Sequence, residues 1–182
     1  MSLTGIWEGY YFQNWVTGES ADIDETSRWA SPIKADLTET NGTIAGRMVD
    51  LKPISEMGGR DCYELLQIRM SWLQKREWKH FLDQNPKVIM RTELPSTSTI
   101  EGKIDGCEVT LVKEYDGHQI TSWIMPGKET SEKVPTAPVY YHGELSEDSN
   151  LIVGTFQVVD PSGRNPTLKG RFRLRKTSNA CS

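Results

Sequence analysis

Long apolar runs, abundant cysteine and an excess of positive charge are all missing from this 182-residue sequence. No apolar stretch approaches the roughly 18 residues that a membrane-spanning helix needs, so we expect no membrane partner. The cysteines Cys62, Cys107 and Cys181 are odd in number and have no C-x-x-C spacing, which argues against a disulfide framework and a zinc site. The 21 basic residues are outnumbered by 25 acidic ones, so no nucleic-acid partner is expected.

Catalytic and metal-binding motifs are also missing. The sequence has no G-x-S-x-G, no H-E-x-x-H and no glycine-rich phosphate loop. Its histidines, His80, His118 and His142, fall on different expected elements, so we predict no metal and no cofactor. No basic leader followed by an apolar segment opens the chain, and the expected location is the cytoplasm.

Short stretches in which apolar and polar residues alternate dominate the sequence, and this period of two is typical of half-buried strands. Asn41-Gly42 and Asp105-Gly106 each lie between two such stretches, where they favour tight hairpin turns. Counting one strand on each side of these turns gives eight strands, within residues 4–13, 32–50, 97–117, 139–145, 151–159 and 168–176.

Eight short strands in sequence order favour an all-β fold, an eight-stranded antiparallel up-and-down barrel, because closure removes exposed sheet edges. A β-sandwich is the alternative. Glycines inside the strands, such as Gly46 and Gly143, support the barrel, because they permit sharp coiling and leave room for large side chains opposite.

One segment departs from the alternation. Within residues 61–85, Trp78, Phe81 and Leu82 continue an apolar stripe at helical spacing, and Asp61 and Glu64 have the spacing of a capping box. We therefore predict one α-helical insertion around 61–85, and we expect residues 125–136 to form a polar connection. No linker composition interrupts the chain, so residues 1–182 are predicted to form a single domain.

The opening "LTGIWEGYY" resembles the G-x-W strand of the calycins, the group of lipocalins, fatty-acid-binding proteins and avidins. The later segments resemble an uncharacterised bacterial set of lipocalin-like and avidin-like barrels, and the resemblance covers most of residues 3–175. These segments are "TIAGRMVD", "RTELP", "IDGCEVTLVKEYDG", "VYYHGEL", "IVGTF" and "GRFRLR". The resemblance implies a calycin-like barrel and, by analogy, an apolar ligand. The chain lacks a T-D-Y-x-x-Y stretch and the tryptophan-rich strands of biotin-binding avidins, so biotin is not predicted.

Strand parity selects the candidate ligand-binding residues, because alternate residues of a strand share one face. If Val109 and Val139 point inward, residues at even spacing from them do so too, and the first strand follows the same rule. The predicted ligand-binding residues are Tyr11, Gln13, Lys113, Tyr115 and Tyr141. A buried lysine needs a partner, which a tyrosine hydroxyl or a bound carboxylate would supply, unless Lys113 reaches the rim and pairs with an acid. Trp7 is expected to close one end of the barrel and pack on a basic side chain.

Three functions remain open at this point. The first is a protein that binds a small, largely apolar ligand in the barrel interior. The second is an enzyme that uses the interior as a reaction chamber, with Lys113 or a tyrosine as acid or base, although no catalytic residue is assigned. The third is a filled barrel that acts as a protein-interaction module. The sequence leaves the oligomeric state undetermined.

Overall fold

The computed structural model describes residues 2–13, 30–66, 71–159 and 168–178, and the chain divides into two compact units. The barrel unit contains Met1–Lys52, Pro95–Gly117 and Thr136–Ser182. The second unit contains Pro53–Leu94 and His118–Pro135. Compactness does not show whether two units fold together, so the single-domain assignment stays a prediction.

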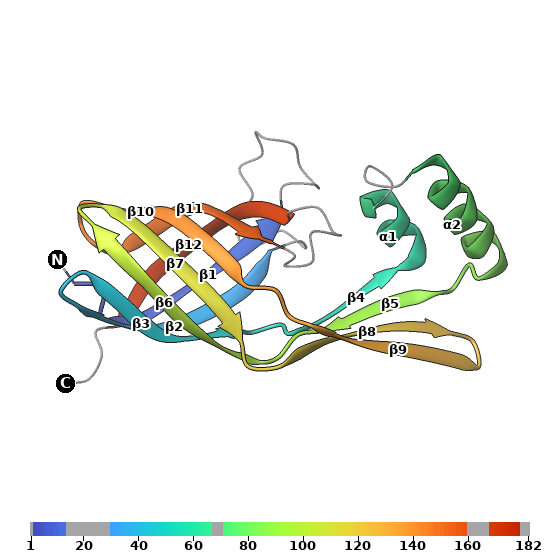
Figure 1. Cartoon of the computed structure of the whole chain (residues 1–182), viewed down its shortest axis with the longest axis horizontal. Coiled ribbons are helices and arrows are strands. Elements are labelled where there is room, and N and C mark those ends of the chain that lie inside the picture. The colour runs from blue at the N-terminus through green and yellow to red at the C-terminus, as the bar shows by residue number, and fades with distance from the viewer. Residues whose placement is uncertain (1, 14–29, 67–70, 160–167, 179–182) are drawn as a thin grey trace. The chain divides into compact units, whose positions relative to one another are not determined.

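The barrel unit is a closed barrel in which every neighbouring pair of strands is antiparallel (Figure 1). Its strands are β1 (Gly5–Gln13), β2 (Ser31–Thr40), β3 (Thr43–Asp50), β6 (Thr97–Asp105), β7 (Glu108–Tyr115), β10 (Val139–Leu145), β11 (Leu151–Val158) and β12 (Leu168–Ser178). They follow one another around the barrel in chain order, and β12 pairs with β1 to close it. The predicted eight-stranded up-and-down barrel is therefore confirmed.

The two predicted hairpin turns join β2 to β3 and β6 to β7. Asn41 and Gly42 both have positive φ, 51° and 78°, as a type I′ turn requires. In the second turn Gly106 has φ 60°. Both turns keep the strands in register, so that the apolar residues of each strand face the interior.

The close approach of neighbouring strands explains why two facing positions in β10 and β11 are both glycine. Gly143 of β10 and Gly154 of β11 are register partners. A Cβ atom on Gly143 would lie 2.8 Å from the ring of Phe172, which points into the barrel from β12. Gly143 therefore leaves room for a large side chain, as the sequence indicates, and Gly154 allows the backbones of β10 and β11 to approach closely.

Trp7 is fully buried in the first half of β1. Its indole Nε1 donates a hydrogen bond to the carbonyl oxygen of Leu3 at 2.8 Å, and the ammonium of Lys176 lies 5.7 Å from the ring centroid. Leu3 is also fully buried. The predicted packing of Trp7 against a basic side chain is confirmed.

The second unit is a four-stranded antiparallel sheet with two helices (Figure 1). The sheet order is β4-β5-β8-β9. The elements are β4 (Ile54–Gly58), α1 (Gly59–Leu66), α2 (Trp72–Gln84), β5 (Ile89–Glu93), β8 (His118–Met125) and β9 (Lys128–Pro135). The helices cover one face of the sheet: the ring centroids of Trp78 in α2 and Trp123 in β8 are 5.1 Å apart, and the sulfurs of Cys62 in α1 and Met90 in β5 are 3.5 Å apart.

The helical insertion is confirmed, but it consists of two helices instead of one. The capping box predicted at Asp61 and Glu64 is wrong, because α1 begins at Gly59 and Asp61 lies inside its first turn. The capping box of the insertion begins α2: Gln74 N donates to Ser71 Oγ, and Ser71 N donates to Gln74 Oε1 at 2.8 Å. No helix among the described residues is long and apolar enough to cross a membrane.

The expectation of a polar connection at residues 125–136 is wrong, since this segment contains the turn of the β8–β9 hairpin and nearly all of β9. Gly127 has φ 75° and supplies the turn. β9 is an edge strand whose residues are nearly all exposed on both faces, so its sequence shows no alternation of apolar and polar residues.

Candidate functional site

The polar residues of the barrel interior gather at one end of the barrel. In an up-and-down barrel the last residues of alternate strands lie at the same end as the first residues of the strands between them. Asp50 is the last residue of β3 and Tyr115 is the last residue of β7, while Ser31 begins β2. We call this the Asp50 end. Trp7 lies toward the opposite end, near the beginning of β1.

A buried ion pair joins β7 to β3 at the Asp50 end. Lys113 Nζ lies 2.5 Å from Asp50 Oδ2, and the two side chains are 0% and 3% exposed. The two register partners of Lys113, Ile100 and Val139, are buried and apolar. A charge surrounded in this way is costly unless an opposite charge pairs with it, which Asp50 does.

Tyrosine side chains surround this pair. Lys113 Nζ donates a hydrogen bond to the Tyr115 hydroxyl at 3.0 Å and lies 4.2 Å from the centroid of the Tyr115 ring. It lies 6.0 Å from the ring centroid of Tyr11. The ammonium is therefore held by one carboxylate, one hydroxyl and the faces of two aromatic rings.

Aromatic rings from four strands continue the site into the core. Tyr141 packs edge-to-face against Phe172 with ring centroids 5.0 Å apart, and it contacts Phe156 at 6.0 Å. Tyr11 packs edge-to-face against Phe156 at 5.4 Å. These four rings form an apolar wall next to the charged pair, which we call the aromatic wall.

Burial controls the protonation of the group. It raises the pKa of Tyr11, Tyr115 and Tyr141 above the ordinary value, and the negative charge of Asp50 raises these pKa values further. Burial lowers the pKa of Lys113, while the neighbouring Asp50 carboxylate opposes that shift. The three hydroxyls therefore stay protonated at neutral pH and serve as hydrogen-bonding groups.

One oxygen of the buried carboxylate is unused. Asp50 Oδ2 receives the bond from Lys113, but Asp50 Oδ1 is buried and receives no hydrogen bond of normal geometry from any described residue. Hydrogen bonding to the Asp50 carboxylate contributes to the raised pKa values of Tyr11 and Tyr115, but neither hydroxyl has normal hydrogen-bond geometry toward Oδ1. The site therefore holds a hydrogen-bond acceptor without a donor.

Four of the five predicted residues converge at this place: Tyr11, Lys113, Tyr115 and Tyr141. Gln13 is the last residue of β1, and its side chain lies outside the described part of the structure. Convergence does not test the predicted role in ligand binding, which stays a prediction. Lys113 does not reach the rim; its acid partner is inside the barrel.

Asp50 is the functional residue that sequence reasoning missed. Strand parity places it on the same face as Ile44 and Met48, both fully buried. That parity was the available signal. A carboxylate at the end of a strand is normally exposed, however, and its lysine partner lies 63 residues further along the chain.

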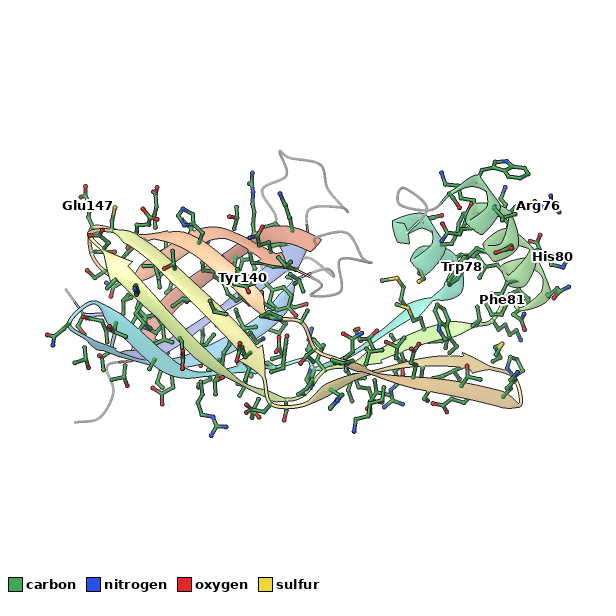
Figure 2. The ribbon with its side chains drawn as sticks, viewed as in Figure 1. Arg76, Trp78, His80, Phe81, Tyr140 and Glu147 are labelled. Atoms are coloured by element: carbon green, nitrogen blue, oxygen red, sulfur yellow. The ribbon has the colours of Figure 1, made fainter. Side chains whose placement is uncertain are left out.

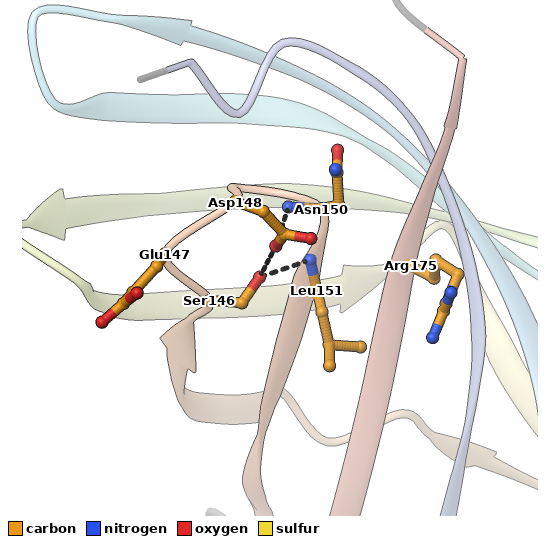
Figure 3. Close-up of a pocket in the computed structure, with 6 residues that line it drawn as sticks. All are labelled: Ser146, Glu147, Asp148, Asn150, Leu151 and Arg175. Carbon is orange, nitrogen blue, oxygen red and sulfur yellow. Dashed lines mark hydrogen bonds between the residues drawn. The ribbon is translucent and has the colours of Figure 1, made fainter.

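A surface depression beside the turn between β10 and β11 is a weaker candidate (Figure 3). Ser146, Glu147, Asp148, Asn150, Leu151 and Arg175 line it. Asp148 Oδ1 accepts hydrogen bonds from Ser146 Oγ and from the backbone N–H of Asn150, and these bonds lower the Asp148 pKa. Leu151 N donates to Ser146 Oγ at 3.0 Å. These bonds hold the turn, so a structural role accounts for them.

Other clusters of reactive side chains are weaker candidates for a functional site. His142 Nδ1 lies 3.6 Å from Glu108 Oε1, but both side chains are more than half exposed. Within the described ranges, no three His, Cys, Asp or Glu side chains are close enough together to hold a metal ion. The Asp50 end is therefore the candidate site.

Comparisons of the chain with protein-family models, with curated proteins and with solved structures find no significant match.

Proposed function

We propose that this protein is a calycin-like barrel that binds a small, largely apolar molecule at the Asp50 end of its interior. The architecture supports this proposal, because an eight-stranded barrel has an interior just wide enough for packed side chains or one modest ligand. The observation that carries it is the buried Asp50–Lys113 pair beside the aromatic wall, with one carboxylate oxygen unpartnered. Sites for small ligands typically combine an apolar lining with a few convergent polar groups.

The protonation of the site favours binding over catalysis. A general acid or base works best when its pKa lies near the working pH. The pKa values of Tyr11, Tyr115 and Tyr141 are raised away from neutrality. Burial lowers the pKa of Lys113, but its ammonium is engaged by the Asp50 carboxylate and the Tyr115 hydroxyl. These groups are therefore suited to hold and orient a molecule.

A titration tests the proposal. Fatty acids, retinoids, tetrapyrroles and biotin are added one at a time while tryptophan fluorescence is recorded, and the chain has six tryptophans to report binding. We expect saturable binding of at least one apolar compound and none of biotin. If no compound binds, the interior is a self-satisfied core and the proposal fails.

A matched pair of variants locates the bound compound. Tyr141→Phe removes a buried hydroxyl from the inner face of β10, whereas Tyr140→Phe removes one from the neighbouring residue, which is 41% exposed on the outer face (Figure 2). We expect Tyr141→Phe to change the affinity and Tyr140→Phe to leave it unchanged. Equal affinities in both variants and the parent protein would place the ligand elsewhere.

A further inference from the structure

The unpartnered oxygen of Asp50 determines which functional group a ligand must carry. Unpaired acceptors are rarely left in protein interiors, because burial removes the water that would otherwise donate to them. Asp50 Oδ1 is such an acceptor among the described residues, and the side chain that carries it is 3% exposed. A molecule that places an N–H or O–H group here would gain a charge-assisted hydrogen bond.

Lys113 is a poor binding partner for an anionic ligand. Its charge is already neutralised by Asp50, and its ammonium is also bonded to the Tyr115 hydroxyl. A ligand carboxylate entering this space would meet the negative charge of Asp50 and lose its own hydration. The site therefore disfavours the head group of a fatty acid.

The surroundings of Asp50 are rich in aromatic rings. The rings of Tyr11, Tyr141, Phe156 and Phe172 meet edge-to-face or at a tilt, and such walls pack well against another aromatic ring. Tyr11 and Tyr115 are only partly buried, while Lys113 is fully buried. These two tyrosines therefore lie closer to solvent than Lys113 does.

Resting on the proposed function, we infer that the ligand class is a neutral, planar ring compound with an N–H or O–H group that Asp50 Oδ1 accepts. The same geometry selects against ring compounds that carry a carboxylate and against those without a donor.

Three probes that share one ring system test this inference. 2-Naphthol offers an O–H donor, 2-methoxynaphthalene replaces that hydrogen with a methyl group, and 2-naphthoate is a carboxylate. Each is titrated into the whole protein at pH 7 by isothermal titration calorimetry. We expect 2-naphthol to bind at least about tenfold more tightly than either of the others, since a hydrogen bond to a charged group contributes this much or more.

A double variant tests whether the preference for 2-naphthol over 2-methoxynaphthalene depends on Asp50. Asp50→Leu combined with Lys113→Met removes both charges together, so that no unpaired charge stays buried. We expect this variant to bind 2-naphthol and 2-methoxynaphthalene equally. Tyr140→Phe is the control and should keep the preference of the parent protein. A preference that survives in the double variant would overturn the role of Asp50.

The remaining outcomes separate this inference from the proposed function. If 2-naphthoate binds most tightly, or if 2-naphthol and 2-methoxynaphthalene bind equally, the ligand does not need an N–H or O–H donor. The proposed function still holds in that case. Equal binding is also the result expected if a water molecule occupies Asp50 Oδ1. If the apolar panel yields a ligand but no naphthalene binds, the planar class is wrong. If neither set binds, both proposals fail.

Discussion

At the scale of single residues, the Asp50–Lys113 pair makes the stability of the barrel depend on both partners together. Removing one partner leaves the other charge buried and unpaired, which costs about 3–5 kcal/mol. Replacing both with apolar residues avoids that penalty and is neutral or stabilising by up to about 4 kcal/mol. Both side chains are almost completely buried, so solvent screening does not weaken this argument.

We therefore predict that Lys113→Met lowers the free energy of unfolding by about 3–5 kcal/mol, whereas Lys113→Met combined with Asp50→Leu restores it to the parent value or above. Urea unfolding followed by circular dichroism measures both. If the double variant is as unstable as the single one, the two residues are not energetically coupled.

The buried tyrosines give stability a distinct dependence on alkaline pH. In the folded protein the pKa values of Tyr11, Tyr115 and Tyr141 are raised, while in the unfolded chain they return to about 10. Above pH 10 the unfolded chain therefore holds fewer protons than the folded one, so stability falls as pH rises. The lowered pKa of Lys113 acts in the opposite direction, but only below the unfolded value of about 10.4.

We predict that the free energy of unfolding falls from pH 10 to pH 11 and that Tyr141→Phe makes this fall shallower, by up to about 1.4 kcal/mol per pH unit. Tyr140→Phe is the control and should leave the slope unchanged. Parallel slopes in the parent protein and Tyr141→Phe would mean that Tyr141 ionises as readily in the folded state as in the unfolded chain.

Trp7 contributes to stability through burial. We predict that Trp7→Ala lowers the free energy of unfolding by about 3–5 kcal/mol, because it leaves a cavity beside Leu3 and removes a buried hydrogen bond. Trp72→Ala is the matched control: Trp72 is 72% exposed, and its loss should change stability by about 0.5 kcal/mol or less. Chemical unfolding measures the loss of stability in both variants. Equal losses would contradict the core role of Trp7.

At the scale of elements, the sequence predicts a strand well where one of its faces is buried. In β10 buried and exposed residues alternate without interruption from Val139 to Leu145, and the sequence shows the same period. β4 and β5 have five residues each, too few to establish a period, and β9 is an exposed edge. The strands of the second unit were therefore missed, and part of its helical insertion was predicted.

Strand β10 requires glycine at position 143, and this requirement can be tested. We predict that Gly143→Ala destabilises the protein by about 1–3 kcal/mol, because the new methyl group overlaps the Phe172 ring and the Val153 carbonyl. Gly58→Ala is the comparison, since the nearest atom to its new methyl group would be at an ordinary 3.4 Å. Thermal unfolding of both variants measures the difference. A Gly143→Ala protein with the parent's melting temperature would show that the Phe172 ring and the Val153 carbonyl can shift at no cost.

At the scale of the whole molecule, parity within strands predicted which residues face the barrel interior, and four of them meet at one end. The pairing of Lys113 with Asp50 was not predictable in this way. Parity states which face a residue occupies, whereas the height of a residue along the barrel depends on the stagger between β3, β6 and β7. That stagger is a property of the closed barrel and has no local signal.

The same closure implies that the barrel unit can fold without the second unit. All buried residues of the barrel's hydrophobic core belong to the barrel unit, and its ladder of strand pairs is complete without β4, β5, β8 or β9. The chain also returns close to each point where it leaves the barrel unit. Leu94 N donates to the Pro53 carbonyl at 2.8 Å, and Thr136 Oγ1 donates to the Gly117 carbonyl at 3.0 Å. A short loop can therefore replace each inserted segment.

We predict that a chain with residues 53–94 and 118–135 each replaced by a short glycine-containing turn keeps a β-rich circular dichroism spectrum and unfolds in one cooperative step. Joining the ends through short loops costs little chain entropy, because the ends already lie together. Trp7 should stay buried, which quenching of its fluorescence by iodide measures in a variant whose remaining tryptophans are replaced by phenylalanine. If the shortened chain is unfolded while the same tryptophan replacements are tolerated in the full chain, residues 1–182 fold as one inseparable domain.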